Sequence, residues 1–129
     1  MKKVLFLAVM FLFGISIYAS AQNAADKVVK FDKEKYDLGK IAHNEPMTFY
    51  IEFTNISKKP LVVENVMAGC GCTVPEKPTA PIAAGKKGKI KVGYNASADG
   101  SFSKDVTIKF AGVPEVKTIL FTGETVDKK

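Results

Sequence analysis

The sequence predicts an all-β fold: an immunoglobulin-like sandwich of two antiparallel sheets with about seven strands. Three observations predict it. Apolar residues alternate with polar ones, turn signals separate the alternating runs, and no window carries a sustained helical stripe of apolar residues. The chain has 129 residues, of which 47% are hydrophobic. A chain of this size is expected to form a single domain around one core.

Period-two alternation is clearest in residues 47–53, 89–94 and 105–110. Each run places its apolar side chains on one face and its polar side chains on the other, which is typical of a half-buried antiparallel strand. The apolar members of the first run are therefore expected to lie in the core; they are Met47, Phe49, Ile51 and Phe53. Further strands are expected where Val, Ile, Leu and Thr are frequent, at 28–32, 36–41, 61–67 and 115–125.

Turn residues lie between these runs. Asn, Ser, Gly and Pro cluster at 55–60, 95–101 and 111–114, so the strands recur at a spacing typical of a sandwich. The stretch 69–88 is rich in Gly and Pro and is expected to be the longest irregular segment. Long irregular segments are uncommon in compact domains and often carry function.

The first 21 residues have the features of a signal peptide. Two lysines precede an apolar run over 4–18, and the small residues that follow predict cleavage between Ala21 and Gln22. The alternative is an uncleaved anchor, but the run is short for a membrane span. Residues 22–129 are then one exported domain without a membrane span, in the periplasm of a Gram-negative bacterium or secreted.

The positive charge comes entirely from lysine. The formal net charge is +6, and the sequence contains no arginine, the residue best suited to bidentate recognition of phosphate or guanine. Within the densest group, Lys87, Lys89 and Lys91 alternate with Gly88 and Ile90, a pattern that indicates the solvent face of a strand. No aromatic platform accompanies these lysines, so a nucleic-acid partner is not expected.

Cys70 and Cys72 are the only cysteines, and three interpretations of the pair remain open. In the first, they are structural, either as two small buried residues or as a local disulfide. In the second, they act in thiol exchange, because a disulfide that closes a short ring is easily reduced. The third possibility is a Cu(I) site with Met67 or His43, since thiolate and thioether ligands suit a soft metal. Zinc would need four ligands, more than two cysteines and one histidine supply.

Other motifs for chemistry are absent from the sequence. A single histidine, His43, lies in an expected turn, and no nucleophile elbow accompanies it, so a Ser-His-Asp triad is not expected. The carboxylate pairs are scattered, and the glycine-rich residues around the cysteines lead to Pro75 rather than to a helix. We therefore expect no catalytic residues and no cofactor.

The central part of the chain resembles a known bacterial family. The pattern runs from Asn55 and Pro60-Leu61-Val62-Val63, through Cys70-Gly71-Cys72-Thr73-Val74-Pro75 and Pro81-Ile82, to Gly85, Ile90-Lys91-Val92, Gly100 and Phe102-Ser103-Lys104. It is similar to the domain of unknown function 1573, over about residues 31–126. The resemblance implies an immunoglobulin-like sandwich related to cilium-associated and major-sperm-protein domains, which are interaction modules. It implies no activity.

These observations together predict an exported, non-enzymatic module for protein interaction, as a scaffold or accessory domain. Its partner would be a protein or another component of the cell envelope. The contact surface would be either a sheet edge or the cysteine-bearing loop at 69–88. The alternative function is a thiol-redox or Cu(I)-handling protein that works through Cys70 and Cys72.

Overall fold

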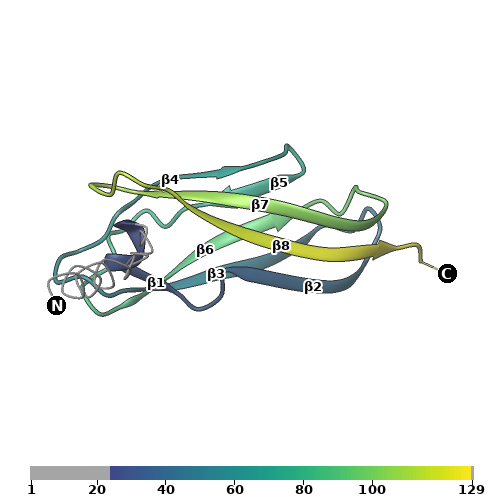
Figure 1. Cartoon of the computed structure of the whole chain (residues 1–129). Helices are drawn as coiled ribbons and strands as arrows, with labels where there is room; N and C mark the ends of the chain where they lie inside the picture. The colour runs from purple at the N-terminus through teal and green to yellow at the C-terminus, as the bar shows by residue number, and fades with distance from the viewer. Residues whose placement is uncertain (1–23, 129) are drawn as a thin grey trace, which may run out of the picture.

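A computed structural model describes residues 24–128 of the chain as two facing four-stranded sheets (Figure 1). The predicted signal peptide, with its cleavage site between Ala21 and Gln22, lies outside the described residues. The first sheet has the order β1 (Val29–Phe31), β3 (Met47–Asn55), β6 (Lys87–Tyr94) and β5 (Thr73–Glu76). The second sheet has the order β2 (Lys35–Ala42), β8 (Lys117–Val126), β7 (Gly100–Phe110) and β4 (Val63–Ala68). A short 3₁₀ helix, η1 (Ala24–Lys27), precedes β1.

The predicted all-β sandwich is confirmed, with eight strands in the described residues rather than about seven. The additional strand is β5, which pairs with β6 inside the segment expected to be irregular. The sequence did not predict this strand, because a proline such as Pro75 usually indicates that a segment is not a strand. β5 lies at the edge of its sheet, and an edge strand tolerates proline at a position that forms no hydrogen bond with the neighbouring strand. β7 also begins earlier than the expected run at 105–110, at Gly100. Ser101 and Ser103 are exposed on either side of the buried Phe102, so the alternation typical of a strand already holds there.

The second sheet is mixed rather than purely antiparallel. The chain crosses from the first sheet to the second between β1 and β2, and β2 then pairs in parallel with β8. The register shifts between Asp37 and Lys40, where Gly39 has a φ of 67°. A left-handed backbone of this kind favours glycine, so Gly39 supplies the extra residue of a bulge in an edge strand.

The core lies between the two sheets and is rich in phenylalanine. Ile51 and Phe53 on β3 are fully buried, as their alternation predicts, whereas Met47 and Phe49 are half-buried and pack against the core. The ring of Phe53 contacts that of Phe110 across the sandwich, with 5.5 Å between the ring centroids. Contact between aromatic rings at this spacing adds to the free energy gained by burying them.

Glycine is required at one position of β8. A Cβ at residue 123 would lie 2.7 Å from the buried Phe102 ring and 2.9 Å from the backbone oxygen of Gly39. We expect Gly123→Ala to lower the free energy of unfolding by about 1–3 kcal/mol, because the core or the β2 backbone must move. The matched control is Gly93→Ala on β6, where the nearest atom would lie 3.6 Å away, an ordinary contact. Urea denaturation measures both; equal losses would contradict the expected crowding at Gly123.

Within residues 24–128, the structure contains no helix with the length and apolar character needed to cross a membrane.

Candidate functional site

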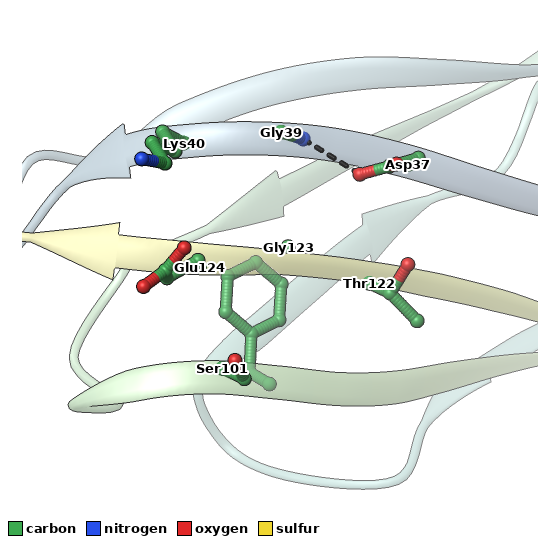
Figure 2. Close-up of a pocket in the computed structure, with 8 residues that line it drawn as sticks. Asp37, Gly39, Lys40, Ser101, Thr122, Gly123 and Glu124 are labelled. Carbon is green, nitrogen blue, oxygen red and sulfur yellow. Dashed lines mark hydrogen bonds between the residues drawn. The ribbon is translucent and has the colours of Figure 1, made fainter.

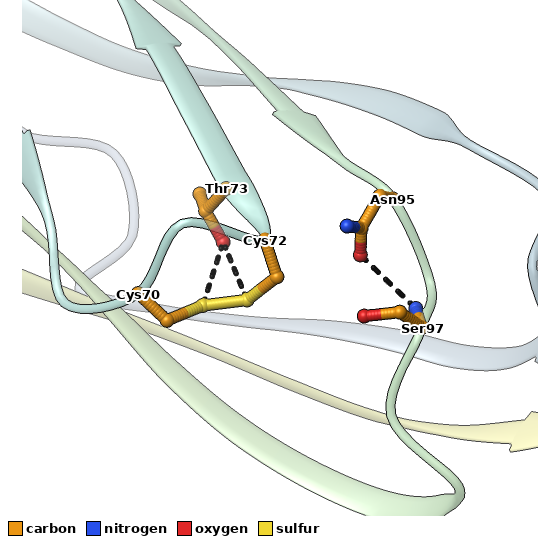
Figure 3. The surroundings of a disulfide bond; sticks show 5 residues. All are labelled: Cys70, Cys72, Thr73, Asn95 and Ser97. Atoms are coloured by element: carbon orange, nitrogen blue, oxygen red, sulfur yellow. Dashed lines mark hydrogen bonds between the residues drawn. A yellow bond between two sulfur atoms is a disulfide. The ribbon is translucent and has the colours of Figure 1, made fainter.

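The cysteines lie at the corner where the chain leaves β4 in the second sheet and enters β5 in the first (Figure 1). The structure joins Cys70 and Cys72 in a disulfide, with their Cα atoms 5.3 Å apart (Figure 3). In an extended strand this separation would be about 6.6–6.8 Å, so the turn between the sheets brings the two residues together. Both cysteines are half-buried at the surface of the corner.

Backbone hydrogen bonds hold the corner independently of the disulfide. The amide of Gly69 donates to the Asp105 carbonyl at 3.2 Å, and the amide of Asn95 donates to the Cys72 carbonyl at 3.0 Å. The chain-entropy model gives only about 1.6 kcal/mol for a disulfide that closes three residues, against about 3 kcal/mol for fifteen. The disulfide is therefore a minor contributor to the stability of a corner that is already tied to both sheets.

The side chain of Thr73 lies against both sulfur atoms. Its Oγ1 is 3.6 Å from the Sγ of Cys72 and 3.8 Å from the Sγ of Cys70, and the residue is only 5% exposed (Figure 3). Because disulfide sulfurs carry no hydrogen, the hydroxyl is the donor in both contacts. The sequence analysis did not predict Thr73 as a site residue. The only indication in the sequence was its position directly after Cys72, which places a hydroxyl group next to the cysteine pair.

A surface hollow adjoins the disulfide on the outer face of the first sheet. In the strand register, Thr48, Gly93 and Val74 lie side by side, and the missing side chain of Gly93 leaves a gap between its neighbours. The hollow has a volume of ≈ 260 Å³, and Val74 at its border is 61% exposed. We call it the Gly93 depression; its lining residues are Pro46, Met47, Thr48, Gly71, Cys72, Val74, Gly93, Tyr94 and Asn95.

The lining of the Gly93 depression is predominantly apolar and carries no ionised side chain. The Tyr94 side chain adds no charge to the depression, because it packs against Phe102 and Phe121 in the core, where burial raises the pKa of the phenol. The depression is thus suited to an uncharged, apolar side chain more than to an ion.

The structure does not bring together the set proposed for Cu(I). His43 has its Nε2 3.0 Å from a carboxylate oxygen of Asp99 and its Nδ1 3.5 Å from one of Asp127. Met67 points outward from β4 and is exposed, and the two sulfurs of Cys70 and Cys72 are bonded to each other. No group of three or more His, Cys, Asp or Glu residues in the described part of the chain is placed to hold a metal.

The lysines of β6 share a solvent face, as their alternation predicts. Each one has an acidic neighbour, so the row is not a free cationic surface. The pairs are Lys87–Asp32 at 2.9 Å, Lys89–Glu52 at 3.5 Å and Lys91–Glu76 at 3.7 Å. The hydrogen bond to Asp32 raises the pKa of Lys87 and keeps this lysine charged within its pair.

The edge of β5 offers few groups to an added strand. Residues in an antiparallel pair bond alternately toward the partner and away from it, and the bond between Asn95 and Cys72 fixes which residues face β6. Thr73 and Pro75 therefore direct their backbone groups outward. The Thr73 amide already donates to the Cys70 carbonyl at 3.4 Å, and proline has no amide hydrogen.

The other edges are also blunted. On β4, the Lys77 ammonium donates to the Glu64 carbonyl at 2.7 Å, and the Val66 amide donates to the Asn65 side chain at 2.9 Å. A bulge interrupts β2, and β1 has three residues. Natural sheets use such devices to resist pairing with another chain. These devices therefore count against pairing at a sheet edge, one of the two predicted contact surfaces.

A second hollow lies on the outer face of the second sheet, between β2, β8 and β7 (Figure 2). It is bordered by Asp37, Lys40 and Glu124, with Gly39 and Gly123 in its floor. One oxygen of the Asp37 carboxylate accepts a hydrogen bond from the Gly39 amide at 2.8 Å, so this acid caps the bulge. The hollow follows from the glycine pair and lies away from the disulfide.

A family model described as "Protein of unknown function (DUF1573)" matches residues 29–125. No curated protein matches the chain. Among solved structures, the ASH/PapD-like domain 7 of human CEP192 is similar, with a TM-score of 0.63 and 8% identity over 80% of this chain and 88% of that one. These values indicate a shared fold.

Two bacterial structures are also similar. A protein of unknown function from Porphyromonas gingivalis W83 has a TM-score of 0.64 and 17% identity over 75% of this chain. The VesB protease of Vibrio cholerae has a TM-score of 0.63 and 14% identity over 79% of this chain. The matches span 46% and 33% of those chains, so the similarity covers only part of each.

Proposed function

The chain belongs to the DUF1573 family, and on that premise we propose that it is an exported, non-enzymatic module that binds a protein of the cell envelope. The contact surface is the corner between β4 and β5, with the Gly93 depression as its centre. The domain acts as a scaffold or accessory component in the periplasm or outside the cell.

One observation carries the proposal: the Gly93 depression places an apolar hollow beside an exposed apolar side chain. Val74 and Cys72 form one border, and Thr48 on β3 forms another. Exposed apolar surface next to a hollow is typical of sites that take an anchoring side chain from a partner. A volume of ≈ 260 Å³ suits one large apolar side chain from an extended partner segment better than a drug-sized ligand.

Two further features support the proposal. The PapD-like domain of CEP192 is similar in fold, and in folds built on packed sheets the connecting segments commonly carry the binding residues. The disulfide is compatible with an oxidising compartment, which agrees with the signal peptide predicted at residues 1–21.

Site-specific photocrosslinking tests the proposal in cells that express the protein. We expect a photoreactive residue at Val74 to cross-link reproducibly to the same envelope protein. The matched control is Leu120, an apolar residue on the outer face of the second sheet that is 42% exposed. Val74→Asp should reduce cross-linking from position 48 by about tenfold, because it introduces a charge into an apolar contact. Equal cross-linking from residue 120, or no effect of Val74→Asp, would refute this contact surface.

A further inference from the structure

We propose that the Cys70–Cys72 disulfide is a thiol-exchange site that accepts electrons from a protein dithiol, with Cys72 as the attacked sulfur and Thr73 as the donor that stabilises the leaving thiolate. The reaction does not depend on the partner proposed above, and small thiols test it without that partner.

The setting of the disulfide favours exchange over a structural role. The two backbone bonds that tie the corner to the sheets, Gly69 to Asp105 and Asn95 to Cys72, do not involve the sulfur atoms, so opening the disulfide need not release the β4–β5 connection. The loop that it closes has a sequence separation of two, and short loops add little to stability. Both cysteines are half-buried rather than enclosed in the core, so a thiol can reach them.

The geometry distinguishes the two sulfurs. Exchange requires a thiolate to approach along the line of the S–S bond. The Gly93 depression is lined by Cys72 and not by Cys70. Figure 3 places Asn95, another lining residue, on the Cys72 side of the disulfide. A thiolate that enters the depression comes from the Cys72 side of the disulfide, so we assign the Sγ of Cys72 as the attacked atom and the Sγ of Cys70 as the leaving group.

The exchange balances with one protein dithiol. Its thiolate attacks the Sγ of Cys72, a mixed disulfide forms, and the broken S–S bond leaves its electron pair on the Sγ of Cys70. The second thiol of the partner loses its proton and attacks the partner's own sulfur in the mixed disulfide, which releases Cys72 as a thiolate. The partner leaves as a disulfide, oxidised by two electrons. Cys70 and Cys72 are reduced by two electrons and take up the two protons that the partner's thiols lose.

Thr73 is placed to assist the first step. Its hydroxyl lies 3.8 Å from the Sγ of Cys70, and a hydrogen bond to this atom becomes stronger when the sulfur gains a negative charge. A leaving thiolate with a lower pKa departs faster. The same hydroxyl lies 3.6 Å from the Sγ of Cys72. A hydrogen bond to that atom stabilises the Cys72 thiolate when the second step releases it.

The first experiment compares Thr73→Val, which removes the hydroxyl and keeps the shape, with Thr73→Ser, which keeps the hydroxyl. Reduction by dithiothreitol at pH 7 is followed by alkylation and intact mass, and circular dichroism verifies the fold. We expect Thr73→Val to slow reduction about tenfold and Thr73→Ser to change it less than about twofold, in line with the loss of one hydrogen bond to a charged group. Equal rates for the two variants would overturn the role of Thr73. A wild-type disulfide that excess dithiothreitol leaves intact in the folded protein would overturn the whole proposal.

The second experiment assigns the attacked sulfur with a matched pair of variants. Cys70→Ser leaves the Cys72 thiol beside the depression, and Cys72→Ser leaves the Cys70 thiol behind it. With glutathione disulfide as the probe, we expect the Cys70→Ser protein to form its mixed disulfide at least about fivefold faster, because access controls exchange. A faster reaction of Cys72→Ser, or equal rates, would overturn the assignment of Cys72.

Discussion

Replacing Asn55 by aspartate is expected to lower the free energy of unfolding by about 3–5 kcal/mol at pH 7. Asn55 is fully buried at the end of β3. Its Nδ2 donates to the carbonyls of Lys59 at 2.7 Å and Ile82 at 2.9 Å, and its Oδ1 accepts from the amide and the hydroxyl of Ser57 at 3.0 and 2.7 Å. A carboxylate cannot donate, so a buried negative charge would face two carbonyl oxygens.

Urea denaturation measures the Asn55→Asp effect, and Ser57→Ala is the control. The control removes one of the four contacts of Asn55, together with the contacts of the Ser57 hydroxyl with the Lys59 backbone, and should lower the free energy of unfolding by about 1–2 kcal/mol. The loss in Asn55→Asp should shrink as the pH falls, because burial raises the pKa of the new carboxyl and the protonated form can donate one hydrogen bond. Similar denaturation midpoints for Asn55→Asp and the wild type would show that this network does not anchor the fold.

Phe53→Ala is expected to cost about 3–5 kcal/mol of unfolding free energy, because a fully buried ring leaves a cavity. The ring contacts those of Phe31 and Phe110, at 5.7 and 5.5 Å between centroids, and it also covers Gly88, where a Cβ would lie 2.5 Å from it. The surrounding side chains therefore cannot close the space easily.

Tyr50→Ala is the matched control for Phe53→Ala, on the opposite face of the same strand. Tyr50 is 51% exposed, so its loss should cost less than about 1 kcal/mol. Thermal or urea unfolding of both variants gives the comparison. A smaller loss for the buried ring than for the exposed one would contradict the placement of the core between the sheets.

The hydrophobic alternation predicted most of this fold because it reports burial directly. Ile51 and Phe53 lie in the core, and Lys89 and Lys91 face solvent, as the pattern of apolar and polar residues requires. Alternation carries no information about the partner of a strand, so the parallel pairing of β2 with β8 could not be predicted. β5 was not predicted because proline excludes a segment from the centre of a sheet, whereas β5 with its Pro75 lies at a sheet edge, where proline is tolerated.

The candidate site was predictable only in part. The two cysteines are recognisable in the sequence, and their spacing allowed the disulfide. The Gly93 depression depends on the register that sets Gly93 between Thr48 and Val74, three residues from separate parts of the chain. The contact of Thr73 with both sulfurs depends on the turn at the corner, which local propensity does not determine.

In the proposed function, the surface of the β4–β5 corner, rather than a sheet edge, contacts the partner protein. The most direct measurement is amide chemical-shift mapping of the labelled domain, titrated with the partner that cross-links to Val74. We predict that the largest shifts fall around the Gly93 depression, at Gly71, Val74 and Gly93. Shifts concentrated along β2 instead would contradict the claim and indicate that the partner adds a strand to the second sheet.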